Sequence, residues 1–391
     1  MQNVAVMEPM MPESGRWKLE DLATELVGKA NALASRVHPV VRQSVGDLVR
    51  SMNCYYSNLI EGHDTHPRDI NRALAEDYST EPKKRALQLE AHAHIEVQRM
   101  IDGGKVDLPL ISADFVLWVH QEFGKRLPDE LLWVENPDTK EKVRNEPGEL
   151  RRSGVQVGYH VPPGANELPA FMARFEEAYR LDRLSKLQQV IAVAASHHRL
   201  LWIHPFYDGN GRVARLFSHR FLKEIGLGNS LWSASRGLAR RNADYKARLM
   251  GADQDRWNDL DGRGTLSAVG LEAFCSFFLE VCIDQISFME SLLEPAELRR
   301  RMSFWAEDET RAGRLPKGAW PLLREVLNEG EVERGLAPEI TGYKERQART
   351  VLTDLMKRGL LVSDTQRGPV RLGFPIDVVE RWFPQLYPGL G

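Results

Sequence analysis

Apolar residues along most of the chain recur every three to four positions, with charged residues between them. This spacing is typical of amphipathic helices, which bury one face and expose the other. The stretch from Val190 to Ala195 lacks a polar face, so we expect its helix to be the central buried one. The predicted helices span residues 17–33, 40–62, 68–78, 84–101, 112–126, 168–179, 186–202, 211–226, 238–250 and 266–292.

The helical pattern is interrupted between residues 127 and 165. From Pro147 to Gly158, small, polar and β-branched residues alternate with turn formers, and Tyr159 to Pro163 follow. Alternation with a period of two, bounded by glycine and proline, is typical of a β-hairpin. The sequence therefore predicts a mainly helical, all-α fold with one β-hairpin.

The pattern changes again beyond residue 318. Short helical stretches are followed by the turn Thr341-Gly342, a further helix and two apolar strands around a polar turn. Helix, helix-turn-helix and hairpin is the element order of a winged helix. The predicted helices span residues 320–327, 332–340 and 345–357, and the predicted strands span 360–363 and 370–372.

These changes divide the chain into five segments. The first is rich in Met, Pro, Glu and Ser, and the fourth joins charged clusters to Gly313, Pro316 and Gly318. We expect a disordered tail at 1–15, a helical region at 16–110, a core at 111–295, a linker at 296–318 and a winged-helix-like domain at 319–391.

The composition excludes several classes of protein. The 391 residues are 42% hydrophobic and 27% charged with a net charge of -3, which favours neither nucleic acid nor membrane as a general partner. The three cysteines lack metal-type spacing, so we expect buried, reduced thiols. No apolar stretch approaches the roughly 20 residues that span a bilayer, and the start does not have the pattern of a signal peptide. We expect a cytoplasmic protein without a membrane partner.

The stretch from Trp202 to Arg215 combines residue types that packing does not require together. Backbone N–H groups at a helix start bind anions, guanidinium groups suit phosphate, a carboxylate suits Mg²⁺, and an imidazole accepts a proton near neutral pH. Together they indicate phosphoryl or nucleotidyl transfer to a hydroxyl group. Each residue alone also has a packing explanation, as a core histidine, a helix cap or a turn former. The residues are His204, Asp208, Gly209, Asn210, Gly211, Arg212 and Arg215.

Two other interpretations fit this stretch less well. Its glycines and Glu224 partly match a dinucleotide-binding pattern, but helical spacing rather than a strand precedes them. The nearby histidines lack the two-histidine helix motif of zinc proteases. Those histidines are His197, His198, His204 and His219.

The run from His204 to Arg215 resembles the signature of the Fic family, His-Pro-Phe-x-Asp/Glu-Gly-Asn-Gly-Arg-x-x-Arg, at every specified position. Members of this family are mostly AMP transferases, which move AMP from ATP to a Ser, Thr or Tyr hydroxyl of a target protein and release pyrophosphate. The resemblance implies that His204 is the general base and that Asp208 is the ligand of Mg²⁺ or Mn²⁺. It also implies a mainly helical Fic core.

The same resemblance assigns the phosphates of ATP. It implies that Gly209, Asn210 and Gly211 hold the α-phosphate, and that Arg212 and Arg215 hold the outer phosphates. Phosphate-transferring Doc relatives have a lysine where this chain has Gly211, so the resemblance favours AMP transfer over kinase chemistry.

The resemblance extends to both sides of the signature. The predicted hairpin is similar to the flap that lies over the family's site and pairs with the target as an added strand. This similarity implies that Val155, Gln156, Val157 and Gly158 bind the target. Residues 242–245 also follow the layout of the family, and this resemblance implies that Tyr245 approaches the adenine.

Residues Ser57 to Gly62 resemble the inhibitory motif of the family, Ser/Thr-x-x-x-Glu-Gly/Asn. On residue types alone, Glu61 is a solvated glutamate in the last turn of a helix, where the helix dipole disfavours it. In the family this glutamate pairs with the second arginine, here Arg215, and blocks the productive position of the γ-phosphate. Some relatives also use it to position the water that removes AMP from the target. We therefore expect an AMP transferase restrained by Glu61.

The partners of the C-terminal module stay open at this point. Seven acidic residues between Glu325 and Asp354 favour protein contact, and the alternative function is a DNA-binding regulator whose Fic core senses nucleotide. Family members often pair, so a homodimer is also open. The basic residues available to DNA are Lys344, Arg346, Arg349, Lys357, Arg358, Arg367 and Arg371.

Overall fold

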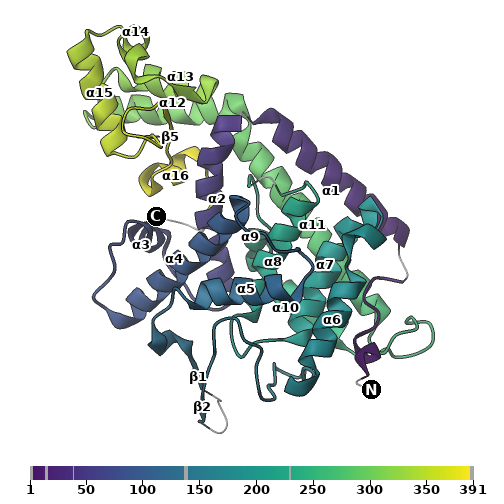
Figure 1. The fold of residues 1–391 in the computed structure, drawn as a ribbon. Coiled ribbons are helices and arrows are strands. Elements are labelled where there is room, and N and C mark those ends of the chain that lie inside the picture. The colour runs from purple at the N-terminus through teal and green to yellow at the C-terminus, as the bar shows by residue number, and fades with distance from the viewer. Residues whose placement is uncertain (1–2, 14–15, 38, 136–139, 229, 388–391) are drawn as a thin grey trace. The chain divides into compact units, whose positions relative to one another are not determined.

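The computed structural model describes residues 3–13, 16–37, 39–135, 140–228 and 230–387. These residues are mainly helical, as the hydrophobic pattern predicts (Figure 1). They form two compact units. Unit 1 comprises residues 1–30, 53–229 and 233–285, and unit 2 comprises residues 31–52, 230–232 and 286–391. The domain boundaries expected from the sequence stay a prediction.

The helices up to residue 293 follow the predicted spacing closely. Ser112 caps one of them by accepting from the Phe115 amide at 3.1 Å, as expected. They are α1 (Arg16–Arg36), α2 (Pro39–Ile60), α3 (Pro67–Leu74), α4 (Pro82–Asp102), α5 (Ala113–Gly124), α6 (Leu168–Ala178), α7 (Lys186–Ile203), α8 (Asn210–Glu224), α9 (Ala234–Arg240), α10 (Asn242–Asp253) and α11 (Ala268–Leu293).

Helices α7 and α8 lie side by side in unit 1 (Figure 1). Helix α7 is buried along most of its length, including Val190 to Ala195, which confirms its predicted central position. The predicted helix over 238–250 is instead two helices that break at Arg241. Asn242 begins α10, and asparagine favours helix starts over helix interiors because its side chain competes for backbone hydrogen bonds.

The expected hairpin lies elsewhere than predicted. Strands β1 (Trp133–Glu135) and β2 (Lys142–Arg144) pair antiparallel ahead of the predicted segment. Residues 148–163 form an irregular loop with one β-bridge, between Val157 and His160. A buried arginine, Arg151, fixes this loop by donating to the carbonyls of His204 at 2.8 Å, Ser153 at 2.9 Å and Pro163 at 2.5 Å. These side-chain contacts replace the strand ladder that alternation predicts.

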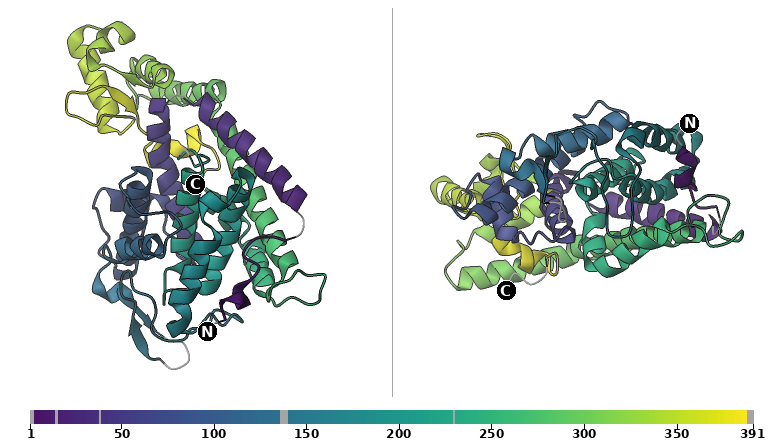
Figure 2. Two further views of the ribbon diagram at one scale, coloured as in Figure 1. Left: turned by 45° about the vertical axis from the view of Figure 1, so that its right-hand side comes forward. Right: turned by 90° about the horizontal axis from the view of Figure 1, so that it is seen from below.

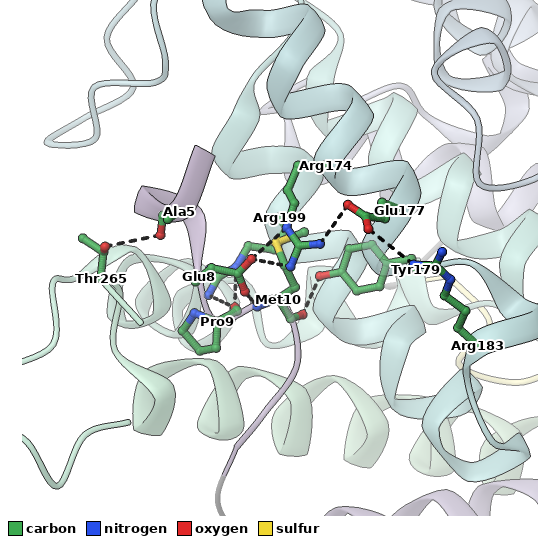
Figure 3. Close-up of polar contacts among 10 residues, drawn as sticks. All are labelled: Ala5, Glu8, Pro9, Met10, Arg174, Glu177, Tyr179, Arg183, Arg199 and Thr265. Carbon is green, nitrogen blue, oxygen red and sulfur yellow. Dashed lines mark hydrogen bonds and ion pairs between the residues drawn. The ribbon is translucent and has the colours of Figure 1, made fainter. Parts of the chain in front are cut away.

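The expectation of a disordered tail is wrong for residues 3–13, which pack against other residues of unit 1 (Figure 3). Met7 and Met10 are buried in the core. Arg199, itself buried, donates to the Pro9 carbonyl through Nε at 3.1 Å and Nη2 at 2.8 Å. The Tyr179 hydroxyl donates to the Met10 carbonyl at 2.7 Å. The two methionines supply apolar burial that composition alone does not reveal.

The expected linker at 296–318 is wrong up to residue 311, because α12 (Pro295–Arg311) occupies it. Its apolar residues Leu298, Met302, Trp305 and Ala306 are buried, at spacings of four, three and one. The charged clusters that suggested a linker cover the rest of the helix surface, as amphipathic helices allow.

The C-terminal module of unit 2 contains the expected helices and hairpin, with a strand, β3, added after the first helix, and its assignment as a winged helix stays a prediction. Strands β3, β5 and β4 form an antiparallel sheet in that order, and the elements from α12 onward gather together in light green to yellow (Figure 2). The predicted helix over 332–340 is shorter, because β3 and a 3-10 turn take its first half. The elements are α13 (Ala319–Glu329), β3 (Glu331–Val332), α14 (Ala337–Thr341), α15 (Glu345–Lys357), β4 (Leu361–Val362), β5 (Val370–Leu372) and α16 (Ile376–Trp382).

Two expectations from composition can be compared with the described residues. Cys54, Cys275 and Cys282 are buried free thiols, as expected. No helix in the described part of the chain is long and apolar enough to cross a membrane.

Candidate active site

The turn between α7 and α8 reverses the chain through two left-handed residues. His204, the C-cap residue of α7, has φ 50° and ψ 62°, and Gly209, the N-cap residue of α8, has φ 85°. Asn210 stabilises the turn, since its side chain accepts from the Phe206 amide at 3.0 Å and donates to the Phe206 carbonyl at 2.9 Å. Both polar atoms of the Asn210 side chain are thus engaged, and it acts on the site by shaping the turn.

The start of α8 is a strongly positive environment. The first backbone N–H groups of a helix have no partner within it, and the helix dipole adds positive potential there. Arg212 and Arg215 follow within the first two turns, and their side chains are buried. Two buried guanidinium groups beside a helix start form an anion site of the kind predicted for phosphate.

Arg215 is held by the residues that the inhibitory motif singles out. Its Nε donates to the Ser57 hydroxyl at 2.8 Å, and its Nη2 donates to the Ser57 carbonyl at 3.2 Å and to Glu61 Oε1 at 2.5 Å. Ser57 lies in α2 and Glu61 directly follows that helix. The structure therefore brings Ser57, Glu61 and Arg215 into contact, although Arg215 lies more than 150 residues after the other two.

The Glu61 carboxylate lies directly beside the start of α8. A Cβ atom added to Gly211 would overlap Glu61 Oε1, so the carboxylate fills the space next to that glycine. Burial alone would raise the pKa of Glu61, but the charge and hydrogen bond of Arg215, with Arg212 and His63, lower it. Glu61 is therefore an anion in the anion site.

Arg212 lies between two carboxylates. Its guanidinium is 3.5 Å from Glu90 and 3.6 Å from Asp208, and it stacks over the Phe123 ring at 4.9 Å. Glu90 also bonds His63 Nδ1 at 2.7 Å, and this hydrogen bond is the main reason why the pKa of His63 is raised. Glu90 and His63 were not predicted from the sequence, because neither belongs to the signature or the inhibitory motif.

Asp208 is more than half exposed at the mouth of the turn, so its carboxylate is accessible to a metal ion. Among the residues that the structure describes, no group of three or more His, Cys, Asp or Glu side chains is arranged to hold a metal. Mg²⁺ commonly takes one or two protein carboxylates and completes its shell with phosphate oxygens and water. A single exposed Asp208 fits an ion that arrives with ATP.

His204 is suited to accept a proton. Burial, followed by the charge of Arg151, lowers the pKa of His204 to about 4, and the Leu201 carbonyl opposes this shift. The imidazole is therefore neutral at pH 7, which is the form that a general base needs. His204 and the start of α8 are the two ends of the same short turn.

The predicted flap residues lie at an exposed loop tip. Gln156, Val157 and Gly158 are exposed, and Val155 is partly so. His160 anchors this tip, because its Nε2 is 2.7 Å from the Trp202 carbonyl in α7. The four residues are accessible, although they form a bridged loop rather than the expected strand.

Tyr245 is buried in the structure. Only 2% of its surface is exposed, and its hydroxyl lies 2.7 Å from His197 Nε2. The resemblance that suggested Tyr245 carries no information on which side of α10 is buried. The adenine contact that it implies stays a prediction.

His120, which belongs to neither motif, packs against the turn. The His120 ring stacks on Phe206 with centroids 3.8 Å apart, and its Nδ1 accepts from the Gly148 amide at 2.9 Å. Burial lowers the pKa of His120 to about 4, so this ring is neutral as well. His120 thus joins α5 to the signature turn and to the start of the loop over 148–163.

Comparison with known proteins agrees with this geometry. Residues 110–222 match the Fic/DOC family. An 81-residue segment is 44% identical to "Protein adenylyltransferase Fic" of Drosophila erecta and 46% identical to the protein of the same name from Drosophila willistoni. That segment is 21% of this chain and covers 16% of the length of each of these relatives.

Solved structures show a similar fold over a longer range. A Fic family protein from Desulfovibrio desulfuricans is 17% identical with a TM-score of 0.52, and the similarity covers 90% of this chain and 95% of that one. Fic-1 (residues 134–508) from C. elegans is 15% identical with a TM-score of 0.53, covering 72% of this chain and 74% of that one. The match to the Fic/DOC family, over residues 110–222, includes the whole turn from His204 to Arg215.

Proposed function

We propose that this chain is a protein adenylyltransferase, which moves AMP from ATP to a Ser, Thr or Tyr hydroxyl of a target protein. The observation that carries the proposal is that one turn joins a neutral histidine, His204, to a helix start flanked by buried arginines. The names of the Drosophila relatives support it over the aligned segment.

In the proposed reaction, His204 removes the proton of the target hydroxyl. The hydroxyl oxygen forms a bond to the α-phosphorus of ATP, the bond from that phosphorus to the bridging oxygen breaks, and pyrophosphate leaves with both electrons. The N–H groups at Gly211 and its neighbours stabilise the charge that develops on the α-phosphate oxygens. Asp208 would hold Mg²⁺, which neutralises phosphate charge when bound.

In the same proposal, Glu61 restrains the enzyme. Its carboxylate occupies the guanidinium of Arg215, which would otherwise hold an outer phosphate of ATP. It also places a negative charge beside the helix start, where it repels the incoming phosphates. The same carboxylate is the candidate group for orienting a water molecule in the removal of AMP.

Labelled ATP tests the reaction class. Glu61→Gly protein and a Glu61→Gly/His204→Ala double variant are incubated with Mg²⁺, lysate and ATP labelled at the α- or γ-phosphate. The proposal expects protein-bound label from α-labelled ATP only, and only with His204 intact. Retention of γ-label would indicate kinase chemistry instead, and retention of α-label by the double variant would remove His204 as the base.

A second candidate function, DNA binding, is favoured by one observation on α15. Its buried face is Ala348, Val351, Leu352 and Leu355, and its exposed residues include three basic ones and a single acidic one, at the first position of the helix. Five of the seven acidic residues that weighed against DNA lie before this helix, on α13, β3, α14 and their connections. The exposed residues of α15 are Glu345, Arg346, Gln347, Arg349, Thr350, Thr353 and Lys357.

A gel-shift experiment tests this second candidate with the full chain. We expect micromolar protein to shift duplex DNA at 50 mM salt, with affinity falling steeply by 200 mM because phosphate contacts release counterions. Arg346→Glu/Arg349→Glu protein should lose the shift. No salt-sensitive shift by the unaltered chain would leave protein contact as the role of the module.

A further inference from the structure

A carboxylate from outside the signature lies against the first arginine of α8. Oε2 of Glu90, on α4, is 3.5 Å from Nη1 of Arg212, and the two side chains are only 12% and 6% exposed. Helices α4 and α8 contact each other within unit 1. Burying a charge without a partner is costly, and Glu90 supplies the anion that the buried guanidinium of Arg212 needs.

The Glu90 carboxylate is itself held by a hydrogen-bond donor. His63 Nδ1 lies 2.7 Å from the same Oε2 atom, and a carboxylate only accepts, so the ring nitrogen donates. His63 is two residues beyond Glu61, which is bound to Arg215. The short segment after α2 therefore reaches both arginines of the signature, Arg215 directly and Arg212 through Glu90.

The other side of the Arg212 guanidinium faces the mouth of the turn. Its Nη2 is 3.6 Å from the carboxylate of Asp208, which is too long for a hydrogen bond, and the Asp208 side chain is 57% exposed. The guanidinium also stacks over the Phe123 ring at 4.9 Å. Among the described residues, the buried Nε of Arg212 has no hydrogen-bond partner. Arg212 is thus anchored by Glu90 and Phe123 while it retains the capacity to donate to a ligand.

We propose that Glu90, oriented by His63, is a positioning residue that holds the Arg212 guanidinium ready for an outer phosphate of ATP. This inference rests on the proposed function, in which Arg212 binds that phosphate. The physical reason is preorganisation, because a long arginine side chain that is already held in place loses less freedom when the phosphate arrives. Glu90 also carries a negative charge that repels phosphate, so positioning and repulsion predict opposite changes when it is removed.

Loss of the anchor should weaken the binding of ATP selectively. Ordering one long side chain is worth about three- to tenfold in affinity, so Glu90→Ala should weaken ATP by about that factor. Affinity for AMP should change less than about twofold, because AMP lacks the outer phosphates that Arg212 holds in the proposed function. Tighter binding of ATP by Glu90→Ala would show that Glu90 acts by repulsion, and would overturn the proposal.

The experiment compares Glu90→Ala with Asp102→Ala, both in the Glu61→Gly chain. Asp102 is the matched control, since it ends the same helix, its side chain is 7% exposed, and it lies 2.7 Å from His219 of α8. Calorimetry with Mg²⁺ measures the dissociation constants of ATP and AMP for each variant. We expect only Glu90→Ala to weaken ATP relative to AMP. Equal weakening of ATP and AMP, or the same result for both carboxylates, would overturn the proposal.

A further variant tests whether Glu90 acts through Arg212. In the Glu61→Gly/Arg212→Ala chain, Glu90→Ala should leave the ratio of the two dissociation constants unchanged within about twofold, because the group that Glu90 positions is gone. A further selective loss of ATP affinity in that chain would show that Glu90 acts by another route, and would overturn the proposal.

Two substitutions at His63 separate its hydrogen bond from its packing. His63→Asn keeps a side-chain N–H donor and should retain the preference for ATP, whereas His63→Leu should lose part of it. Equal loss in both would show that His63 does not orient Glu90 through this hydrogen bond. Glu90→Gln keeps the volume of the side chain and should also lose part of the preference. Thermal unfolding confirms that the compared variants are folded.

The outcome is distinguishable from a failure of the proposed function. Absence of α-label transfer by the Glu61→Gly chain would remove the proposed reaction, yet a selective loss of ATP affinity in Glu90→Ala that vanishes without Arg212 would still support the positioning of Arg212. If the Glu61→Gly chain binds no ATP, both proposals are overturned.

Discussion

Arg215 donates through Nη2 to the Glu61 carboxylate at 2.5 Å, across an interval of 154 residues. The pair lies at the start of α8, where a phosphate would otherwise bind. The arginine that we propose to hold an outer phosphate of ATP is thus the residue to which an internal carboxylate is bound.

Ser57→Ala should release part of the restraint. The Ser57 hydroxyl accepts from Arg215 Nε at 2.8 Å, while the Ser57 carbonyl contact is retained in the variant. Losing one of these hydrogen bonds should raise the rate of AMP transfer severalfold, and by less than Glu61→Gly does. Incorporation of α-label measures it. A rate equal to that of the unaltered chain would show that Ser57 does not help to hold the pair.

The restraint by Glu61 should not depend on pH between about 5.5 and 8. A carboxyl whose folded pKa is lowered stays ionised above its ordinary value of about 4.3, and its contact is lost only as pH falls through the lowered value. The ratio of Glu61→Gly to unaltered rates should therefore be constant across this window. A ratio that collapses toward one as pH falls from 7 to 6 would contradict an ionised Glu61.

The base should give a different pH profile from that of an ordinary histidine. Because the pKa of His204 is lowered to about 4, its neutral form persists as pH falls through 6.5. The value of kcat/KM for Glu61→Gly protein should show no inflection near 6.5 and should fall only as pH approaches 4. An acid limb centred near 6.5 would mean that His204 is solvated in the working enzyme, or that another group is the base.

Met7→Ala should destabilise the fold, because the N-terminal segment is part of the core of unit 1. Met7 is fully buried, and truncating a buried methionine costs about 2–5 kcal/mol. Met250, which is 52% exposed, provides the matched control, and Met250→Ala should stay within about 0.5 kcal/mol of the unaltered chain. Urea unfolding of the full chain measures both. Similar small effects would indicate that residues 3–13 are a loose tail after all.

The sequence predicted the features that local pattern encodes. A spacing of three to four residues located α1 to α8, because each helix buries a single apolar face. The signature turn was predictable down to single residues, since His204, Asp208 and Gly209 are contiguous and chemically distinct. The pairing of Glu61 with Arg215 came from the resemblance and has no local signal.

Features that depend on tertiary contacts were missed or misplaced. Nothing near Glu90 in α4 indicates that it faces Arg212, which lies 122 residues away. Arg151 looked like one polar position in an alternating strand, yet its three carbonyl contacts produce a loop. The burial of Tyr245 against His197 has no local signal, because His197 comes from another helix. In each case the deciding hydrogen bonds join segments that are distant in sequence.

The most direct test of the central claim is the initial rate of AMP transfer by the unaltered chain, Glu61→Gly and Glu61→Gln at saturating Mg²⁺ and α-labelled ATP. Removing the carboxylate frees Arg215 and clears the helix start, so Glu61→Gly should incorporate label at least about tenfold faster than the unaltered chain, with Glu61→Gln between them because it keeps the volume and loses the charge. Equal or slower incorporation by Glu61→Gly would contradict the claim that Glu61 restrains this enzyme.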